Sequence, residues 1–392
     1  MGVRVDAFLG AGADWASALC YAVAAVGCLY ALFVGRAARE FARAPMATAD
    51  SYPAVTILKP LYGSEPNLFA NLARFCFQDY PSAVQIVFGV DDPSDPAVRA
   101  VRALIAAFPD RDLKLVVNSC RHGSNRKVSN LINMLGEAQH EVLVLSDSDI
   151  VVGRDYLKNI VASLEAPGVG LVTCLYRSAA DAGTWARLGA AAIDYHFLPS
   201  VLVGLKLGLA APCFGSTIAI RKQTLATIGG FESVVDQLAD DYALGALVRR
   251  AGHTVAIPTT MVAHVCAARS ASGLFRHEMR WARTIRSVDP LGYAGLVITH
   301  ALPLALLGLL LGGVAPAGIL VIAALACRFS LQSQLNRAFD LRDDTFWLLP
   351  LRDVLSFGVF VAGFFGGRVE WRGHRYALQA GNRLAYYGKI ET

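Results

Sequence analysis

Short apolar runs alternate with amphipathic stretches along the first part of the chain, starting near residue 55. An apolar run of four to eight residues bounded by polar groups is typical of a strand buried on both faces, as in a parallel sheet. Strands that alternate with helical patterns indicate an α/β domain with a mostly parallel sheet. The predicted strands are Val55–Leu58, Val84–Val90, Leu113–Val117, Val142–Leu145 and Val169–Cys174, followed by Ser216–Ile220, Val255–Ile257 and Met261–Val265.

Carboxylates follow two of these strands. Asp92 comes after the second strand, and Asp147-Ser148-Asp149 follows Val142–Leu145. Ligands of open α/β sheets bind beyond the carboxyl ends of the strands. Because side chains two residues apart in an extended segment point the same way, Asp147 and Asp149 are predicted to reach one cation, such as Mg²⁺ held together with phosphate oxygens. A solvated turn that ends the strand is the alternative.

Apolar blocks occupy both ends of the sequence. Residues 16–34 are uncharged and long enough to cross a bilayer, and Arg36, Arg39 and Arg43 follow them. The positive-inside rule therefore places the next part of the chain in the cytoplasm. Because the basic residues come after the apolar run, a signal anchor is favoured over a cleaved signal peptide.

Two or three further membrane segments are predicted near the C-terminus. Residues 291–334 form an apolar block broken at Gly312-Gly313 and Pro316, and residues 346–365 form another that contains Arg352-Asp353. One span before the domain and three after it would leave the basic tail outside, against the positive-inside rule. One of the C-terminal segments is therefore expected to lie in the interface or to re-enter.

Two other segments are apolar without a clear span. Residues 184–211 are too interrupted to cross, and an interface segment and a core helix pair both fit them. His277-Glu278-Met279-Arg280-Trp281 lies among arginines just before the second apolar block, as a basic amphipathic helix on a membrane surface would. It lacks the second histidine that a zinc protease motif requires.

Composition agrees with the presence of membrane segments. The hydrophobic fraction of 55% and the mean hydropathy of +0.44 exceed those of usual soluble domains. Eight cysteines without a CxxC pair indicate small buried residues in a reducing compartment. The formal charge of +5 is modest, and the arginines suit phosphates or an anionic leaflet better than nucleic acid.

Taken in order, the motifs resemble those of inverting nucleotide-sugar glycosyltransferases. They are Asp92 after a strand, Asp147-Ser148-Asp149 after a strand, Asp240-Asp241-Tyr242 and Arg280-Trp281. Within that group the chain is most similar to ceramide glucosyltransferases (glycosyltransferase family 21, related to family 2) and to bacterial hopanoid-biosynthesis glycosyltransferases. Supporting stretches are Leu58-Lys59-Pro60-Leu61, Gln78-Asp79-Tyr80-Pro81, Asn125-Arg126-Lys127-Val128-Ser129-Asn130 and Trp371-Arg372-Gly373-His374-Arg375-Tyr376.

The resemblance implies a GT-A type fold and a role for each motif. Asp92 would contact the uridine, and Asp147 and Asp149 would hold Mg²⁺ or Mn²⁺ on the diphosphate. Asp241 would be the general base; spacing alone does not exclude Asp240, and ordinary helix capping is the alternative for both. Further expected nucleotide-binding residues are Lys59, Lys127, His277 and Arg280, and Arg280 and Trp281 would stabilise the departing nucleotide.

Two residues depart from patterns known among relatives. His277 stands where many relatives have Gln or Arg, which leaves its role open. Asp149 is present, whereas some ceramide glucosyltransferases lack this second carboxylate. An exposed loop lysine is the alternative for Lys127.

The expected protein is a multi-pass enzyme of the bacterial inner membrane or an equivalent membrane, with its catalytic domain in the cytoplasm. It would move glucose or N-acetylglucosamine from a UDP-sugar to ceramide or a hydroxylated hopanoid. Alternatives are transfer to polyprenyl phosphate or a growing polysaccharide, and a non-catalytic membrane-tethered nucleotide-binding protein. The predicted divisions are an anchor with a basic linker (1–50), a GT-A domain (51–268), an interface segment (269–290), membrane segments (291–367) and a basic tail (368–392).

Overall fold

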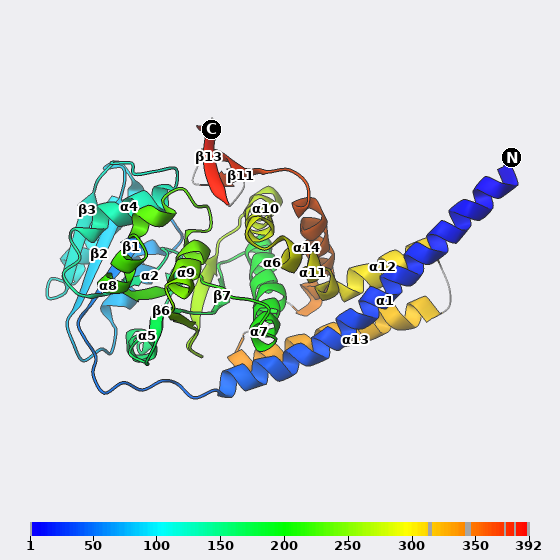
Figure 1. The fold of residues 1–392 in the computed structure, drawn as a ribbon, viewed down its shortest axis with the longest axis horizontal. Helices are drawn as coiled ribbons and strands as arrows, with labels where there is room; N and C mark the ends of the chain where they lie inside the picture. Colours follow the sequence, from blue (N-terminus) through cyan, green and yellow to red (C-terminus); the bar gives the residue numbers. More distant parts are fainter. Residues whose placement is uncertain (1, 313–315, 342–345, 372–373, 380–381, 390–392) are drawn as a thin grey trace. The chain divides into compact units, whose positions relative to one another are not determined.

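The chain folds into two compact units. The computed structural model describes residues 2–312, 316–341, 346–371, 374–379 and 382–389 (Figure 1). One unit, the sheet unit, comprises Ala44–Ala186, Ala211–Arg269 and Gly367–Thr392. The other, the helical unit, comprises Met1–Arg43, Arg187–Ala210 and Ser270–Gly366. The sheet unit therefore includes the C-terminal tail as well as the predicted α/β region.

A seven-stranded sheet forms the centre of the sheet unit, with the strand order β3-β2-β1-β4-β8-β6-β9. Strands β1 to β4 run parallel, β8 runs antiparallel to β4 and β6, and β6 is parallel to β9. The predicted mostly parallel α/β sheet is thus confirmed. The strands are β1 Val55–Pro60, β2 Val84–Val90, β3 Asp112–Val117, β4 Val142–Leu145, β6 Val169–Thr173, β8 Ile218–Arg221 and β9 Thr254–Ala256.

Burial follows the apolar pattern of the sequence. Every residue of β1 and β4 is buried, whereas the edge strand β3 is partly exposed along its length. Three of the helices pack on a shared apolar core with the sheet, namely α4, α8 and α9. Helices of the sheet unit are α2 Leu68–Cys76, α3 Pro96–Ala107, α4 Arg126–Leu135, α5 Tyr156–Leu164, α8 Lys222–Thr227, the short helix η2 Phe231–Val234 and α9 Asp240–Arg250.

Two small sheets complete this unit, and only part of them was expected. One has the order β5-β10-β7, with β5 Ile150–Val151, β7 Tyr176–Ala180 and β10 Val262–Cys266. The other is antiparallel and is formed by the tail, with β11 Arg368–Trp371, β12 His374–Gln379 and β13 Arg383–Lys389. The strand at β10 was predicted, whereas the tail was described only as basic; its Arg372 lies outside the described residues.

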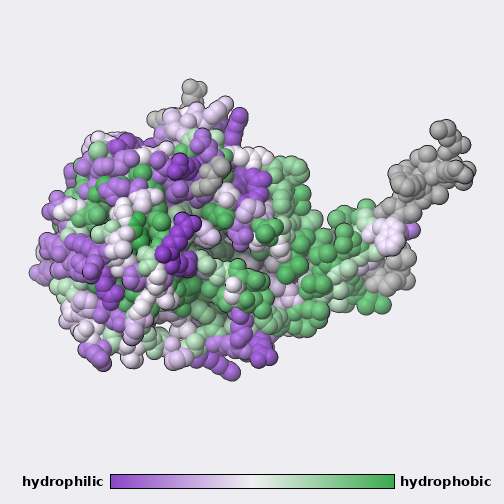
Figure 2. Space-filling view, in the orientation of Figure 1, coloured by the Kyte–Doolittle hydropathy of each residue, from purple (hydrophilic) through white to green (hydrophobic). Residues whose placement is uncertain are grey.

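Apolar helices build the helical unit, and much of their surface in Figure 2 is hydrophobic. The core of this unit joins α1 to α12 and α13 through small and aliphatic side chains, among them Ala24, Ala301 and Ala324. The predicted break within the apolar block 291–334 includes residues 313–315, which lie outside the described residues. The helices are α1 Gly2–Arg43, α6 Thr184–Ala192, η1 Ile193–Phe197, α7 Leu198–Lys206, α10 Ala271–Val288, α11 Pro290–Gly295, η3 Leu296–Thr299, α12 Ala301–Gly312, α13 Pro316–Phe339, η4 Phe346–Leu348 and α14 Leu349–Gly363.

Four helical stretches in the described part of the chain are long and apolar enough to cross a membrane, and a bent pair adds a fifth. The four are Asp14–Arg43, Thr184–Lys206, Gly318–Phe339 and Phe346–Gly363, and the bent pair joins Pro290–Thr299 to Ala301–Gly312 at 71°. This confirms apolar segments at both ends of the chain.

The stretch Thr184–Lys206 is one helical run through α6, η1 and α7, and not a pair of helices joined by a turn. Strand β8 follows this run in the sequence, yet it pairs with β4 and β6, which precede it. If the run Thr184–Lys206 crossed the membrane once, β8 would lie on the opposite side from β4 and β6, its neighbours in the same sheet. The run therefore does not cross, in agreement with the interruptions in its sequence.

Candidate active site

The carboxyl ends of three neighbouring parallel strands meet at one edge of the sheet. Strand β1 lies between β2 and β4, so the residues that follow β2 and β4 flank the end of β1. Lys59 belongs to the end of β1, Asp92 follows β2, and Asp147 follows β4. The structure thus brings these predicted residues to the same sheet edge.

Lys127 lies at the centre of a group of carboxylates at this edge. Its Nζ is 2.7 Å from Asp147 Oδ1 and 3.7 Å from Asp240 Oδ2. The side chain is only 10% exposed, so Lys127 is not the exposed loop residue that was the alternative. Burial by itself lowers the pKa of Lys127, but the charges of Asp147, Asp240 and Asp241 together raise the pKa above its ordinary value. The ammonium group therefore stays charged.

Asp240 and Asp241 form the first turn of α9, as the sequence predicted. The backbone N–H groups of Gly215 and Tyr242 donate to the Asp241 carboxylate over 2.7 and 2.8 Å. Burial, and then the charge of Asp240, raises the pKa of Asp241 to about 6. A carboxylate with such a pKa is suited to accept and release a proton near neutral pH.

Gly215 marks the point where these side chains converge. A β-carbon at this position would lie 2.9 Å from both Asp147 Oδ2 and Lys127 Nζ, and 3.4 Å from Asp241 Oδ2. A side chain at this position would displace the ends of the Asp147 and Lys127 side chains, so glycine permits the close approach as it stands. The carboxylates of Asp147 and Asp241, far apart in sequence, are thus close neighbours in the fold.

Asp149 faces a different partner. The segment from Asp147 to Ile150 is a turn, in which the Ile150 N–H donates to the Asp147 carbonyl over 3.3 Å. The expected extended geometry at Asp147 and Asp149 is therefore wrong. Asp149 Oδ2 lies 3.2 Å from His264 Nε2, on β10. Although burial opposes it, the charge of Asp149 raises the pKa of His264 well above its usual value.

Lys59 lies beneath this turn and is fully buried. Its Nζ donates to the Asp147 carbonyl over 2.5 Å and lies 4.0 Å from the centre of the Phe75 ring. Burial lowers the pKa of Lys59 to about 7, against the attraction of Asp147 and Asp149. The nearest polar group of the turn is thus a backbone carbonyl, and the ammonium supports the loop from inside.

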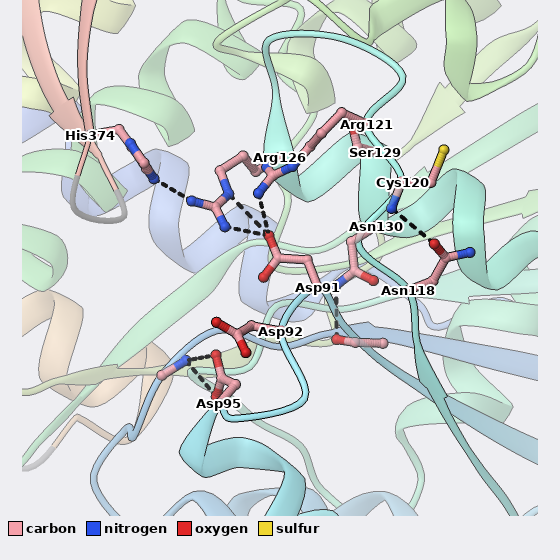
Figure 3. Close-up of polar contacts among 12 residues, drawn as sticks. Asp91, Asp92, Asp95, Asn118, Cys120, Arg121, Arg126, Ser129, Asn130 and His374 are labelled. Atoms are coloured by element: carbon pink, nitrogen blue, oxygen red, sulfur yellow. Dashed lines mark hydrogen bonds and ion pairs between the residues drawn. The ribbon is translucent and has the colours of Figure 1, made fainter. Parts of the chain in front are cut away.

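The end of β2 carries a second charged group (Figure 3). Asp91 accepts from Arg126 over 2.7 and 3.0 Å and pairs with Arg121 at 3.2 Å. Arg126 also contacts His374 on β12. Asp92, the residue predicted to bind uridine, is exposed, and its Oδ1 accepts from the N–H and hydroxyl of Ser94.

His277, Arg280 and Trp281 lie on α10, in the helical unit. The rings of His277 and Trp281 are 4.5 Å apart between centroids, and Phe197 lies 6.4 Å from Trp281. All three predicted residues are partly exposed. They share one amphipathic helix, as the sequence indicated.

The donor set at the sheet edge fits a divalent ion only in part. Asp147 and Asp149 side chains are 33% and 34% exposed and offer oxygen ligands. Among the described residues, no group of three or more His, Cys, Asp or Glu side chains is arranged to hold a metal. Mg²⁺ commonly takes one or two carboxylates and completes its shell with phosphate oxygens and water. The residues therefore fit an ion shared with a bound diphosphate, and not a cage made by protein alone.

Sequence reasoning missed three residues of this site. Gly215 precedes the predicted strand Ser216–Ile220 and His264 lies in the predicted strand Met261–Val265, and neither was given a role. Asn125 caps α4 through Oδ1, which accepts from the Val128 N–H over 3.1 Å, and its amide donates to Asp240 Oδ1 over 3.2 Å. Asn before a helix is a recognisable cap signal. Nothing local to Gly215 or His264 indicates their partners.

Comparisons with known proteins agree on one family. The sequence model described as Glycosyl transferase family 21 matches residues 19–384. The chain is 24% identical over 350 residues to ceramide glucosyltransferase 1 of Caenorhabditis elegans, covering 85% of this chain and 73% of that protein. It is 35% identical over 126 residues to a ceramide glucosyltransferase of Candida albicans, covering 29% of this chain and 23% of that protein.

One solved structure shares the fold. The mannosyltransferase PcManGT from Pyrobaculum calidifontis, in complex with GDP-Man and Mn²⁺, superposes with a TM-score of 0.51 and 21% identity. The match covers 89% of this chain and 99% of that one. At this identity the likeness shows the fold alone, and it confirms the GT-A type architecture predicted from the sequence.

Proposed function

The chain belongs to glycosyl transferase family 21, and from this premise we propose that it moves a hexose from a UDP-sugar to a hydroxyl of a membrane lipid, with inversion at the sugar carbon. One observation carries the proposal. Lys127, Asp147 and Asp241 converge around Gly215 at the carboxyl edge of a parallel sheet. Such an edge is where open α/β sheets bind ligands, and a cation among carboxylates suits a diphosphate and its metal.

Asp241 is the proposed general base. Its carboxylate takes the proton of the acceptor hydroxyl as the oxygen attacks the sugar carbon and the bond to the diphosphate breaks. General base catalysis of this kind contributes about 10²- to 10⁴-fold in rate. The N–H groups of Gly215 and Tyr242 hold the carboxylate in place. Its pKa, raised to about 6 by burial and by Asp240, suits proton transfer. Asp240 is engaged by Asn125 and Lys127, so it is the weaker candidate.

The departing diphosphate needs positive charge. A bound Mg²⁺ or Mn²⁺ on Asp147 and Asp149 would supply Lewis-acid stabilisation of the leaving oxygens. Lys127, in place beside Asp147, would contribute a further charge to the same oxygens. Arg280, Trp281 and His277 are proposed to act on the leaving nucleotide, and Arg280 is suited to charge-assisted hydrogen bonds to phosphate.

Two further residues have proposed roles in holding the donor. The exposed carboxylate of Asp92 is proposed to bind the uridine. Lys59 is fully buried, so we assign it an indirect role: its bond to the Asp147 carbonyl fixes the turn that presents Asp147 and Asp149. Removing a buried donor of this kind leaves a carbonyl unsatisfied, which costs about 1–3 kcal/mol.

The acceptor is proposed to be ceramide or a hydroxylated hopanoid, and the donor UDP-glucose or UDP-N-acetylglucosamine. Ceramide glucosyltransferases among the relatives favour the first acceptor and glucose. The apolar helices would hold the enzyme in a bacterial inner membrane or an equivalent one, with the sheet unit in the cytoplasm. There an amphiphile can approach from the leaflet.

The test is a matrix of both donors and both lipids with the purified, detergent-solubilised full chain, read by product mass. The proposal predicts one hexosylated lipid whose mass identifies donor and acceptor, and loss of product when divalent ions are chelated. A protein that binds UDP-sugars but yields no product with any lipid or polyprenyl phosphate would instead be a nucleotide-binding protein.

A further inference from the structure

The C-terminal sheet is joined by backbone hydrogen bonds to the segment that leads into α9. The Leu238 N–H donates to the Asn382 carbonyl over 3.0 Å, and the Leu384 N–H donates to the Asp236 carbonyl over 2.8 Å. Between them, Gln237 and Arg383 form an antiparallel bridge. The segment from Asp236 to Leu238 thus runs along β13 like an additional strand. Two residues later, α9 begins with Asp240 and Asp241.

Apolar packing also joins the tail sheet to the segment before α9. Leu238 is 6% exposed and shares a small core with Val369, Tyr376 and Leu384, one residue from each tail strand. These three are exposed by 4% or less. This small core joins the tail strands to the segment before α9. The tail is therefore docked and not merely adjacent.

The opposite side of the same segment is held by the residues before α4. Asn125 donates to the Gln237 carbonyl over 2.7 Å, and its own N–H donates to the Val235 carbonyl over 2.8 Å. The Ser124 N–H donates to Asp236 Oδ1 over 2.8 Å. Gly123 allows this approach, because a β-carbon there would lie 2.7 Å from Val235 Cγ1.

A third contact links the tail directly to α4. His374 on β12 contacts Arg126, whose guanidinium is also held by Asp91 at the end of β2 (Figure 3). Arg126 is the first residue of α4, and Lys127 is the second. The tail therefore touches the chain next to Lys127 as well as next to Asp240.

From these three contacts we propose that the C-terminal sheet is a positioning element of the transferase: it clamps the start of α9 against the start of α4, and so fixes Asp241 relative to Lys127 and Asp147. The inference rests on the proposed function for its catalytic consequence, but the clamp itself is a property of the sheet unit. No tail residue needs to touch substrate. His374 carries a side-chain contact from the tail to α4, and its ring also packs against Tyr376 and Tyr386 within the tail sheet.

A positioning role differs from general stabilisation in its kinetic effect. Misplacement of a reacting group by about 1 Å can cost about 10²-fold in rate. His374→Ala should therefore lower kcat by about 10- to 100-fold, with the UDP affinity and the thermal midpoint close to those of the wild type. His374→Gln should restore most of kcat, because its side-chain carbonyl can still accept from Arg126.

Arg375 supplies the matched control. It is the next residue of β12, its side chain is 53% exposed, and its ion pair is with Glu370 at 3.2 Å within the tail sheet. Arg375→Ala should leave kcat unchanged. An unchanged kcat in His374→Ala, or equal losses in His374→Ala and Arg375→Ala, would overturn the proposal. So would a drop in kcat that is matched by a drop in UDP affinity and in the thermal midpoint.

Amide hydrogen exchange tests the clamp without reference to activity. In His374→Ala, the amides of residues 235–241 and the first turn of α4 should exchange faster, with β2 and β4 unchanged. Uniform exchange across the sheet unit, or no change at residues 235–241, would contradict the clamp even in an active enzyme. If the wild type transferred no sugar to any lipid, the proposed function would fail, while the exchange result would still decide the clamp.

Discussion

At the scale of single residues, the site depends on the balance between one buried cation and several partly buried carboxylates. Lys127 is one cation facing Asp147, Asp240 and Asp241, and all of them are wholly or partly buried. Burial disfavours the charged form of Asp241, and the nearby charge of Asp240 adds to this effect. Both raise the pKa of Asp241, against the opposing charge of Lys127.

Replacing the proposed base, Asp241, should separate nucleotide binding from sugar transfer. Asp241→Asn keeps the shape and the hydrogen-bond acceptor for Gly215 but cannot take a proton, so kcat should fall about 10²- to 10⁴-fold with UDP binding retained. Turnover with radiolabelled donor and UDP titration by calorimetry measure the two quantities. Asp240→Asn is the matched control and should cost less. The reverse ranking would transfer the role of base to Asp240.

The pH dependence follows from the same carboxyl group. Only the ionised form of Asp241 accepts a proton, so kcat/KM should be constant above its pKa of about 6 and fall as the pH drops through that value. The profile of kcat/KM against pH, taken with enzyme shown to be folded at each pH, gives the acid limb. An acid limb near pH 4, the ordinary range of a carboxyl group, would mean that the pKa of the base is not raised by its surroundings.

Sequence patterns predicted part of this site and missed the rest for a physical reason. Asp147 stands at a recognisable strand end and Asp241 at a helix start, although the choice of Asp241 over Asp240 came from the family resemblance. The role of Gly215 depends on what surrounds it in space, and the partner of Asp149, His264, comes from a strand of another sheet. Such neighbours depend on long-range pairing that no local pattern encodes.

At the scale of elements, buried ion pairs fasten the helical unit. Arg352 on α14 is 1% exposed and binds Glu278 on α10 through two bonds of 2.7 and 2.8 Å. Arg328 on α13 binds Asp353 through two bonds of 2.7 Å each. Arg352 and Asp353, which interrupt the apolar run in the sequence, therefore link α14 to α10 and to α13. Charged residues inside apolar helices are usually paired in this manner.

Breaking one of these pairs should destabilise the unit more than removing both partners. Glu278→Gln leaves a buried guanidinium without its counter-charge, at a cost of about 3–5 kcal/mol. Glu278→Gln combined with Arg352→Leu should recover part of that loss. Denaturant unfolding of the full chain in detergent compares the variants. Equal stability of the single variant and the wild type would show that the pair contributes nothing.

Element prediction worked best where burial is complete. The run Val84–Val90 forms β2 with those bounds, because all but its first residue are buried and the apolar run is unbroken. The tail sheet was not predicted, since its strands mix charged, aromatic and small residues, as in Arg383–Lys389. Those strands are stabilised by pairing with one another and with residues 236–238, which lie far away in the sequence.

At the scale of the whole molecule, chain connectivity limits how many helices cross a membrane. The tail strands and residues 236–238 form hydrogen bonds in one unit, so the chain between Arg269 and Gly367 must cross an even number of times. Three apolar stretches are available there: the bent pair, α13 and α14. Because α14 carries two buried charged residues, Arg352 and Asp353, and α13 carries one, Arg328, we propose that the two crossings are the bent pair and α13. The basic tail is then on the same side as the sheet unit, which removes the conflict with the positive-inside rule.

This topology can be checked with tags in the full chain. An epitope inserted between Gly312 and Pro316 should be reached by protease only from the side opposite the sheet unit. An epitope after Thr392 should be protected whenever the sheet unit is protected. Protease digestion of sealed vesicles of known orientation measures both. A tail epitope cleaved from the opposite side would contradict the even number of crossings.

We propose that Asp147 and Asp149 hold a divalent ion on the diphosphate of a sugar nucleotide at the edge of the sheet. The most direct measurement is sugar transfer to lipid by the Asp147→Ala/Asp149→Ala double variant, titrated with Mg²⁺ and Mn²⁺ beside the wild type. Wild-type transfer should rise with the metal and stop on chelation, while the folded double variant should stay inactive at every metal concentration. Robust transfer by the double variant would contradict the proposal.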